Sequence, residues 1–128
     1  MTDIFSLNEA ASAVVPVDLP GGGKLMVSGV ANDSVRPLWR KYKELEKAQL
    51  IRSAASQDIM GLISASDKVV DELAKVAVSW EGITSNGQAL NVSPENAVLI
   101  CGANGPFKRK MLNALAESEE RFLGSDET

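Results

Sequence analysis

Cys101 has the side chain of this sequence that is best suited to covalent chemistry. It is the only cysteine of the chain, and the chain contains no histidine. A nucleophilic Cys–His or Ser–His pair is therefore impossible, and so are an internal disulfide and a cysteine-based zinc site. Because Cys101 follows the apolar run 97–100, we interpret it as a small buried apolar side chain.

The run Gly21–Lys24 (GGGK) is the second stretch with a chemical interpretation, that of a phosphate-binding loop. Such a loop needs the pattern G-x-x-x-x-G-K-[ST] between a buried strand and a helix. Here Leu25 follows the lysine, and the next segment is β-prone. The glycines therefore indicate a tight chain reversal rather than a nucleotide site.

The carboxylates complete the search for catalytic groups. They fall on polar helix faces and in terminal segments, and no pair of them is framed by apolar residues at a turn. Catalysis requires a positioned base, nucleophile or metal ion, and a metal site in this chain would need carboxylates alone. We therefore expect a protein that is not an enzyme and holds no cofactor and no metal.

Charge is distributed unevenly along the chain. The net charge is -4 and the isoelectric point about 4.8, which argues against nucleic acid as the main partner. Residues 1–64 carry seven acidic and seven basic residues, so the second half carries the whole acidic excess. Within the first half, the basic residues gather in the segment 36–52. Such a segment is either a solvated helix face or a surface that orients a protein partner. The basic residues of this segment are Arg36, Arg40, Lys41, Lys43, Lys47 and Arg52.

Length and composition indicate one ordinary globular domain. The chain has 128 residues, of which 45% are hydrophobic and 23% charged. It shows no signal-peptide pattern and no apolar run near the roughly 20 residues that span a bilayer. We expect a cytoplasmic protein with no membrane contact, made of a flexible lead-in (1–12), an α+β domain (13–123) and a tail (124–128).

The domain is predicted to be mainly helical, with an N-terminal β-hairpin packed on about four helices. The β-prone segments 13–19 and 24–30 flank the glycine run and form the hairpin. Pro16 has no N–H group to donate, which places its strand at a sheet edge. The Asn86-Gly87 pair predicts a second turn.

Apolar periodicity and capping residues predict the helices. The first begins at Asn32–Ser34 and presents Trp39 and Tyr42, which we interpret as core residues rather than a partner patch. A break near Ser56 and a short piece 59–63 follow. The most apolar helix then runs from a cap at Ser64 or Ser66 to Trp80.

Two further helices complete the prediction. Ser93 caps one that starts at Pro94 and turns Ala97, Val98 and Ile100 inward. The last runs from Pro106 to Gly124, which ends it, and places Phe107, Met111, Leu112, Leu115 and Phe122 on one side. Its basic start, 108–110, and its acidic residues Glu119 and Glu120 oppose the helix dipole, which hints that these charges meet something else.

Three short motifs carry a resemblance to a known family. They are Trp80–Ile83 (WEGI), the Asn86-Gly87 turn and Ser93–Asn96 (SPEN). In this order they resemble the tail assembly chaperones of long-tailed, siphovirus-like bacteriophages, where an apolar helix ends in W-x-G-[IV] and [ST]-P-E-N opens a short helix. The resemblance covers about residues 14–123. It departs at 102–107, where the family often has a leucine-rich helix and Trp-Leu.

The resemblance implies a chaperone that binds the phage tape measure protein, keeps it soluble and recruits tail tube subunits. Such a protein acts in the host cell cytoplasm, is absent from the mature virion, can self-associate, and often has a longer frameshifted form. Trp80, Gly82, Gly87, Ser93 and Pro94 would then be structural. We place the partner-binding surface on the first and last helices, at Arg36, Arg40, Lys43, Lys47, Lys108 and Arg109.

Two alternatives remain open at this point. One is a permanent virion component, such as a tail terminator or a head–tail connector subunit, which would persist in purified particles. The other is an unrelated regulatory or adaptor module. Its gene would not lie between a tube gene and a tape measure gene.

Overall fold

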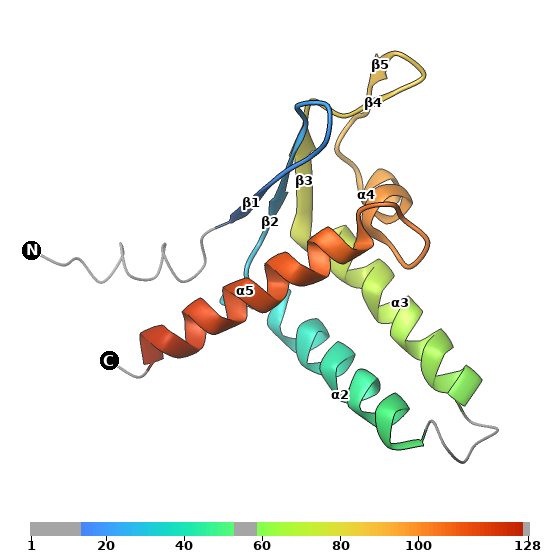
Figure 1. Cartoon of the computed structure of the whole chain (residues 1–128), viewed down its shortest axis with the longest axis vertical. Coiled ribbons are helices and arrows are strands. Elements are labelled where there is room, and N and C mark those ends of the chain that lie inside the picture. The colour runs from blue at the N-terminus through green and yellow to red at the C-terminus, as the bar shows by residue number, and fades with distance from the viewer. Residues whose placement is uncertain (1–13, 53–58, 127–128) are drawn as a thin grey trace, which may run out of the picture.

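An antiparallel sheet of three short strands is the element around which the helices are arranged (Figure 1). The computed structural model describes residues 14–52 and 59–126, with the backbone alone for residues 52 and 122–126. Strands β1 (Val15–Asp18), β2 (Lys24–Val27) and β3 (Val78–Glu81) follow the order β1-β2-β3. Together with the helices they form the predicted, mainly helical α+β domain.

The predicted N-terminal hairpin is confirmed. Strands β1 and β2 pair antiparallel, with Val17 opposite Leu25. The Leu19 N–H donates to the Gly23 carbonyl at 2.8 Å and closes the turn. Pro16 lies on an edge strand, as its missing N–H group requires. The expected lead-in at 1–12 lies outside the described residues.

Strand β3 corrects the prediction that Trp80 ends a helix. Helix α3 (Ile59–Ala77) stops three residues earlier, and the chain continues directly as β3. Val78 and Trp80 are buried while Ser79 between them is less so, and Leu25 of β2 stands opposite Trp80. The spacing of these apolar residues fits a strand as well as a helix, and pairing with the open edge of β2 decides in favour of the strand.

Helix α2 (Arg36–Arg52) and helix α3 pack side by side as an antiparallel pair. Because α3 is continuous from Ile59, the predicted separate piece 59–63 and the cap at Ser64 or Ser66 are wrong. Ser66 is buried inside the helix. Alanine is the strongest helix former and serine costs only a few tenths of a kcal/mol, so the run Ser64-Ala65-Ser66 does not end the helix. The predicted break near Ser56 lies outside the described residues.

Helices α4 (Pro94–Cys101) and α5 (Lys108–Asp126) follow the sheet. The Ser93 side chain accepts a hydrogen bond from the Asn96 N–H at 3.1 Å, so the predicted cap is confirmed. Helix α5 begins two residues after Pro106 and continues through Gly124, which therefore does not end it. The side chain of Phe122 lies outside the part that the structure describes.

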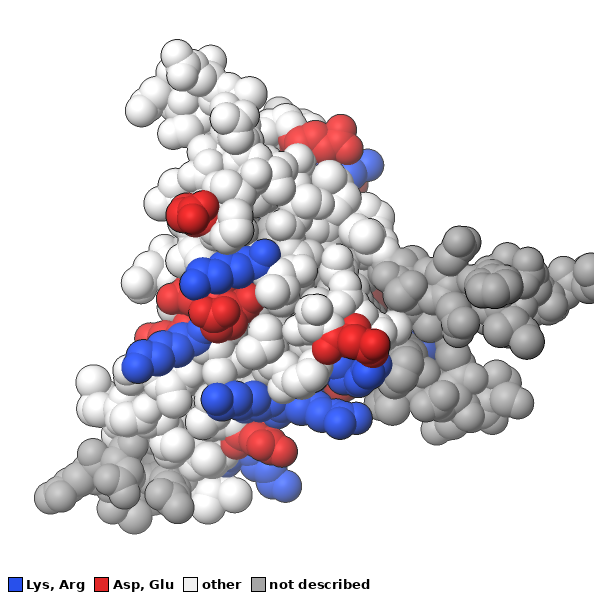
Figure 2. All heavy atoms as spheres, turned by 180° about the vertical axis from the view of Figure 1, so that it is seen from behind, with Lys and Arg blue, Asp and Glu red and all other residues white. Residues whose placement is uncertain are grey.

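A short second hairpin projects from the body beyond the sheet (Figure 1). Strands β4 (Thr84–Ser85) and β5 (Gln88–Ala89) flank Asn86 and Gly87, whose φ angles are 53° and 81°. Both central residues thus have positive φ, which is typical of the predicted Asn-Gly reversal. Seen from behind, this hairpin is free of charge, while basic and acidic side chains mix over the lower body (Figure 2).

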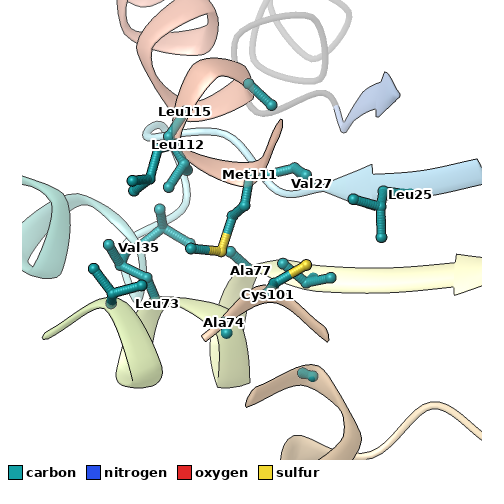
Figure 3. Packing of buried hydrophobic residues seen from close by; sticks show 14 of the residues in the cluster. Leu25, Val27, Val35, Leu73, Ala74, Ala77, Cys101, Met111, Leu112 and Leu115 are labelled. Carbon is teal, nitrogen blue, oxygen red and sulfur yellow. The ribbon is translucent and has the colours of Figure 1, made fainter. Parts of the chain in front are cut away.

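The core lies where α5 crosses the sheet and the inner ends of α2 and α3 (Figure 1). Met111 points into its centre, near Val35, Leu73 and Cys101, which come from three other segments (Figure 3). All four side chains are inaccessible to solvent. Burying a residue of this size stabilises the fold by about 1.5–3 kcal/mol, so this contact region holds the elements together.

Ser118 connects α5 to the segment between β2 and α2. Its hydroxyl donates to the Leu115 carbonyl at 2.8 Å and accepts from the Val30 N–H at 3.1 Å. The Ser118 side chain is almost fully buried, and Ser118 and Val30 lie 88 residues apart in the sequence. A buried N–H group without a partner is costly, so Ser118 satisfies a group that no strand reaches.

Replacing Trp80 with alanine is expected to lower the free energy of unfolding by about 3 kcal/mol or more, as large core truncations do. Trp80 is 5% exposed, and its indole N–H donates to the Leu90 carbonyl at 2.8 Å. Trp80→Phe keeps most of the packing and removes this bond, so a loss of about 1 kcal/mol is expected. Urea denaturation followed by circular dichroism measures both; a loss near zero for Trp80→Ala would contradict the burial.

Ser118→Ala is expected to lower the free energy of unfolding by about 1–3 kcal/mol, because it leaves the buried Val30 N–H without a partner. Asn113→Ala is the matched control, since Asn113 is an exposed polar residue on the same helix. Denaturation curves that coincide for the two variants would show that the Ser118 bond contributes nothing to stability.

Candidate protein-binding surface on helix α2

Helix α2 has an inner face that packs on the domain and an outer face that is basic. The inner face carries Trp39, which is 5% exposed, and the half-buried Tyr42 and Leu45. The rings of Trp39 and Tyr42 stack, with centroids 5.5 Å apart and planes inclined by 18°. The interpretation of Trp39 as a core residue is confirmed, and Tyr42 lies at the edge of the same core.

Three of the six predicted contact residues meet on the outer face. Arg40, Lys43 and Lys47 line one shallow surface hollow together with Glu44. Spacings of three and four residues place them on one side of the helix, since each residue turns by about 100°. Arg40 and Lys47 form no ion pair within the described part of the chain, so their charges face solvent.

Arg36 does not belong to this group. Its guanidinium donates to the Asp33 carboxylate at 2.6 Å and to the carbonyls of Val30 and Ala31 at 3.5 and 3.4 Å. Arg36 thus holds the segment that leads into α2, and its side chain is less exposed than those of Arg40, Lys43 and Lys47. This role needs the tertiary path of residues 30–35, which the sequence pattern does not reveal.

Lys43 connects the two helices that carry the predicted surface. Its ammonium group pairs with the Glu119 carboxylate of α5. The side chains remain 45% and 25% exposed, so the pair is partly screened by water. The expectation that the acidic residues of the last helix meet other charges therefore applies to Glu119.

Lys108 and Arg109 lie apart from the hollow on α2. They occupy the first turn of α5, which follows the Phe107 N–H bond to the Ile100 carbonyl of α4. The charge of Arg109 lowers the pKa of Tyr42, which lies at the inner edge of α2 and not on its outer face. The structure therefore divides the predicted surface into a row on α2 and a separate basic start of α5.

The far end of the α2–α3 pair exposes large apolar side chains. Leu50, Ile51 and Met60 are 77%, 71% and 69% exposed, and Ile63 is 37% exposed. We call residues 41–51 and 59–65 the distal arm; none of its side chains is fully buried. This patch was not predicted from the sequence, although Leu50 and Ile51 follow Leu45 by five and six residues, spacings that place them off the inner face of the helix.

The motif residues of the resemblance have structural positions. Trp80 is bonded to the Leu90 carbonyl and ties the projecting hairpin to the sheet. Gly82 has a φ of 72°, and a β-carbon there would lie 3.2 Å from the Gly23 α-carbon, so the two chain reversals pack tightly. Ser93 and Pro94 open α4, and Gly87 completes the turn. Their predicted structural roles fit this geometry.

The remaining candidates for chemistry are buried or isolated. Cys101 is inaccessible to solvent, and burial raises the pKa of its thiol to about 12, so the interpretation as a buried apolar side chain is confirmed. The described residues contain no cluster of three metal-ligating side chains. Over the same residues, no helix is long and apolar enough to cross a bilayer.

Comparison of the chain with protein-family models, with curated proteins and with solved structures gives no significant match.

The phenol of Tyr42 offers a direct test of its burial on the inner face of α2. Burial and the hydrogen bond and charge of Glu46 raise its pKa from 10.0 to about 12, while Arg109 lowers it. A raised folded-state pKa means that this group stabilises the fold fully below pH 10 and ceases to do so as the pH approaches 12.

Tyr42 is the single tyrosine, so tyrosinate absorbance titrates one group. We expect a midpoint near 12 in the folded protein, and near 10 in urea. Glu46→Gln should lower the folded midpoint, because it removes the charge that opposes tyrosinate formation. Glu44→Gln, on the outer face, should leave it unchanged. Equal midpoints in the folded and unfolded protein would contradict the burial of Tyr42 and its hydrogen bond with Glu46.

Proposed function

We propose that this protein is a non-enzymatic assembly chaperone that binds helical segments of a partner through the distal arm. The observation that carries the proposal is the exposure of Leu50, Ile51 and Met60 at the end of a two-helix arm. Apart from its inner face and the Lys43–Glu119 pair, the arm consists of two helices packed side by side, an arrangement on which a third amphipathic helix can dock. Exposed apolar patches of this kind on a monomer favour a protein-binding role.

The composition of the arm supports a role in holding apolar helices. Met60 is flexible and polarizable, which suits contacts with side chains of varied shape. A buried donor of the arm, the Gln49 amide nitrogen, has no hydrogen-bond partner among the described residues.

The motif resemblance indicates which partner protein the arm would bind. It supports a tail assembly chaperone of siphovirus-like phages, whose partner is the tape measure protein, a long helical chain with apolar surface. In this role the arm covers that surface in the host cell cytoplasm, and tail tube subunits are recruited before the chaperone leaves. The mature virion would then lack the protein.

Co-expression with the candidate tape measure protein tests this function. We expect soluble tape measure protein, recovered by affinity pulldown, only when this chain is present. The double variant Ile51→Ser, Met60→Ser should reduce recovery, because it removes apolar contact area from the arm. Leu99→Ser is the matched control, since Leu99 is 63% exposed on α4, away from the arm.

Three results would contradict the proposal. Tape measure protein that stays insoluble with this chain present would exclude the holding role. Detection of the chain in purified particles by mass spectrometry would favour the alternative of a tail terminator or head–tail connector subunit. Equal recovery with the arm variant and with Leu99→Ser would exclude the arm as the binding site.

A further inference from the structure

The outer face of α2 presents charged and apolar residues in a fixed order. Arg40, Lys43, Lys47 and Leu50 fall within about 80° of the helix circumference, at successive spacings of three, four and three residues. Ile51 flanks Leu50 at the same end and is 71% exposed. We call these five residues the α2 row. A partner that covers the row meets three cations, which share their hollow with Glu44, and then an apolar end.

This order selects one class of partner. A nucleic acid or another polyanion would use the three cations and leave Leu50 and Ile51 in water, and the net charge of -4 opposes its approach. A helix with acidic residues at matching spacings and an apolar residue one turn further can use the whole row. Charge complementarity and the apolar end thus both favour an acidic amphipathic helix.

Lys43, the central cation of the row, is already occupied within the chain. Its partner Glu119 comes from α5, 76 residues away in sequence. A carboxylate of a docking helix in register with Arg40 and Lys47 reaches the same ammonium group and must displace Glu119. The intramolecular pair is partly exposed and therefore weak, so a partner can displace it at small cost.

We propose that the α2 row binds an acidic amphipathic helix of the partner, and that Glu119 of α5 competes with this helix for Lys43. The proposal rests on the proposed function in that the docking helix belongs to the protein held by the arm. To the proposed function it adds two points: the docking helix of the partner is acidic, and the Lys43–Glu119 pair within the chain weakens its binding.

A synthetic peptide tests the row directly with the full chain. The probe is a fluorescein-labelled, end-capped helical peptide with three glutamates at spacings of three and four and a leucine three residues beyond, made in both chain directions. Fluorescence anisotropy should show binding that weakens as salt rises. A permuted peptide of equal composition, with its glutamates spread around the helix, should bind at least about threefold more weakly.

Matched variants locate the binding site. Arg40→Gln with Lys47→Gln should weaken peptide binding about threefold or more, since each exposed ion pair contributes about 0.2–1 kcal/mol. Lys41→Gln removes one positive charge from the same helix outside the hollow and should leave affinity unchanged. Circular dichroism confirms that each variant is folded. Equal loss in Lys41→Gln, or equal binding of both peptides, overturns the proposal.

The competition has its own control. Glu119→Gln should tighten peptide binding by about two- to fivefold, because it releases Lys43 from a weak exposed pair. Glu120→Gln makes the same charge change at the next residue, which is exposed on α5, and should have no effect. Equal affinities for the two variants, or weaker binding by Glu119→Gln, overturn the competition.

Failure of this inference can be told apart from failure of the proposed function. If Arg40→Gln with Lys47→Gln keeps tape measure protein soluble as well as the unmodified chain does, the function stands and the inference fails. If the peptide and variant results hold while tape measure protein stays insoluble, the inference stands and the function fails. A DNA duplex that competes equally with the peptide also overturns the acidic-helix class.

Discussion

Strand β3 hydrogen-bonds to the edge of β2 that β1 leaves open, and Leu25 stands opposite Trp80 across this pairing. Because β3 continues from α3 without a loop, the pairing sets the direction in which α3 leaves the sheet. Helix α2 packs along α3, so its position follows from the same contact. A two-stranded hairpin is marginally stable alone, and the third strand gives the sheet the width on which α5 can pack.

This arrangement concentrates burial at one end of the helical pair. The inner ends of α2 and α3 enclose Val35 and Leu73, which are inaccessible to solvent, while the distal arm has no fully buried side chain. Stability scales with buried apolar area, so the arm contributes little to the fold for its length. Because the arm has few internal contacts, Leu50 and Met60 stay exposed.

The charges follow a similar division of roles. Arg36 binds the backbone that enters α2, and Lys43 pairs with α5, so both of these cations already have partners within the chain. Arg40 and Lys47 share the hollow with Glu44 and remain turned to solvent. The overall acidity of the chain is therefore compatible with a local cationic row, because α2 carries six basic residues against two acidic ones, Glu44 and Glu46, and the acidic excess lies on other parts of the chain.

The sequence by itself determined the features that depend on local chemistry. The glycine reversal after Leu19, the Asn86-Gly87 turn and the Ser93 cap each follow from backbone preferences of a few neighbouring residues, and the apolar surroundings of Cys101 predicted its burial. Trp80 on a strand, Arg36 at the backbone and the Lys43 contact with Glu119 were decided only by the tertiary structure. Each depends on a partner that lies far away in the chain, at a position that periodicity and spacing do not contain.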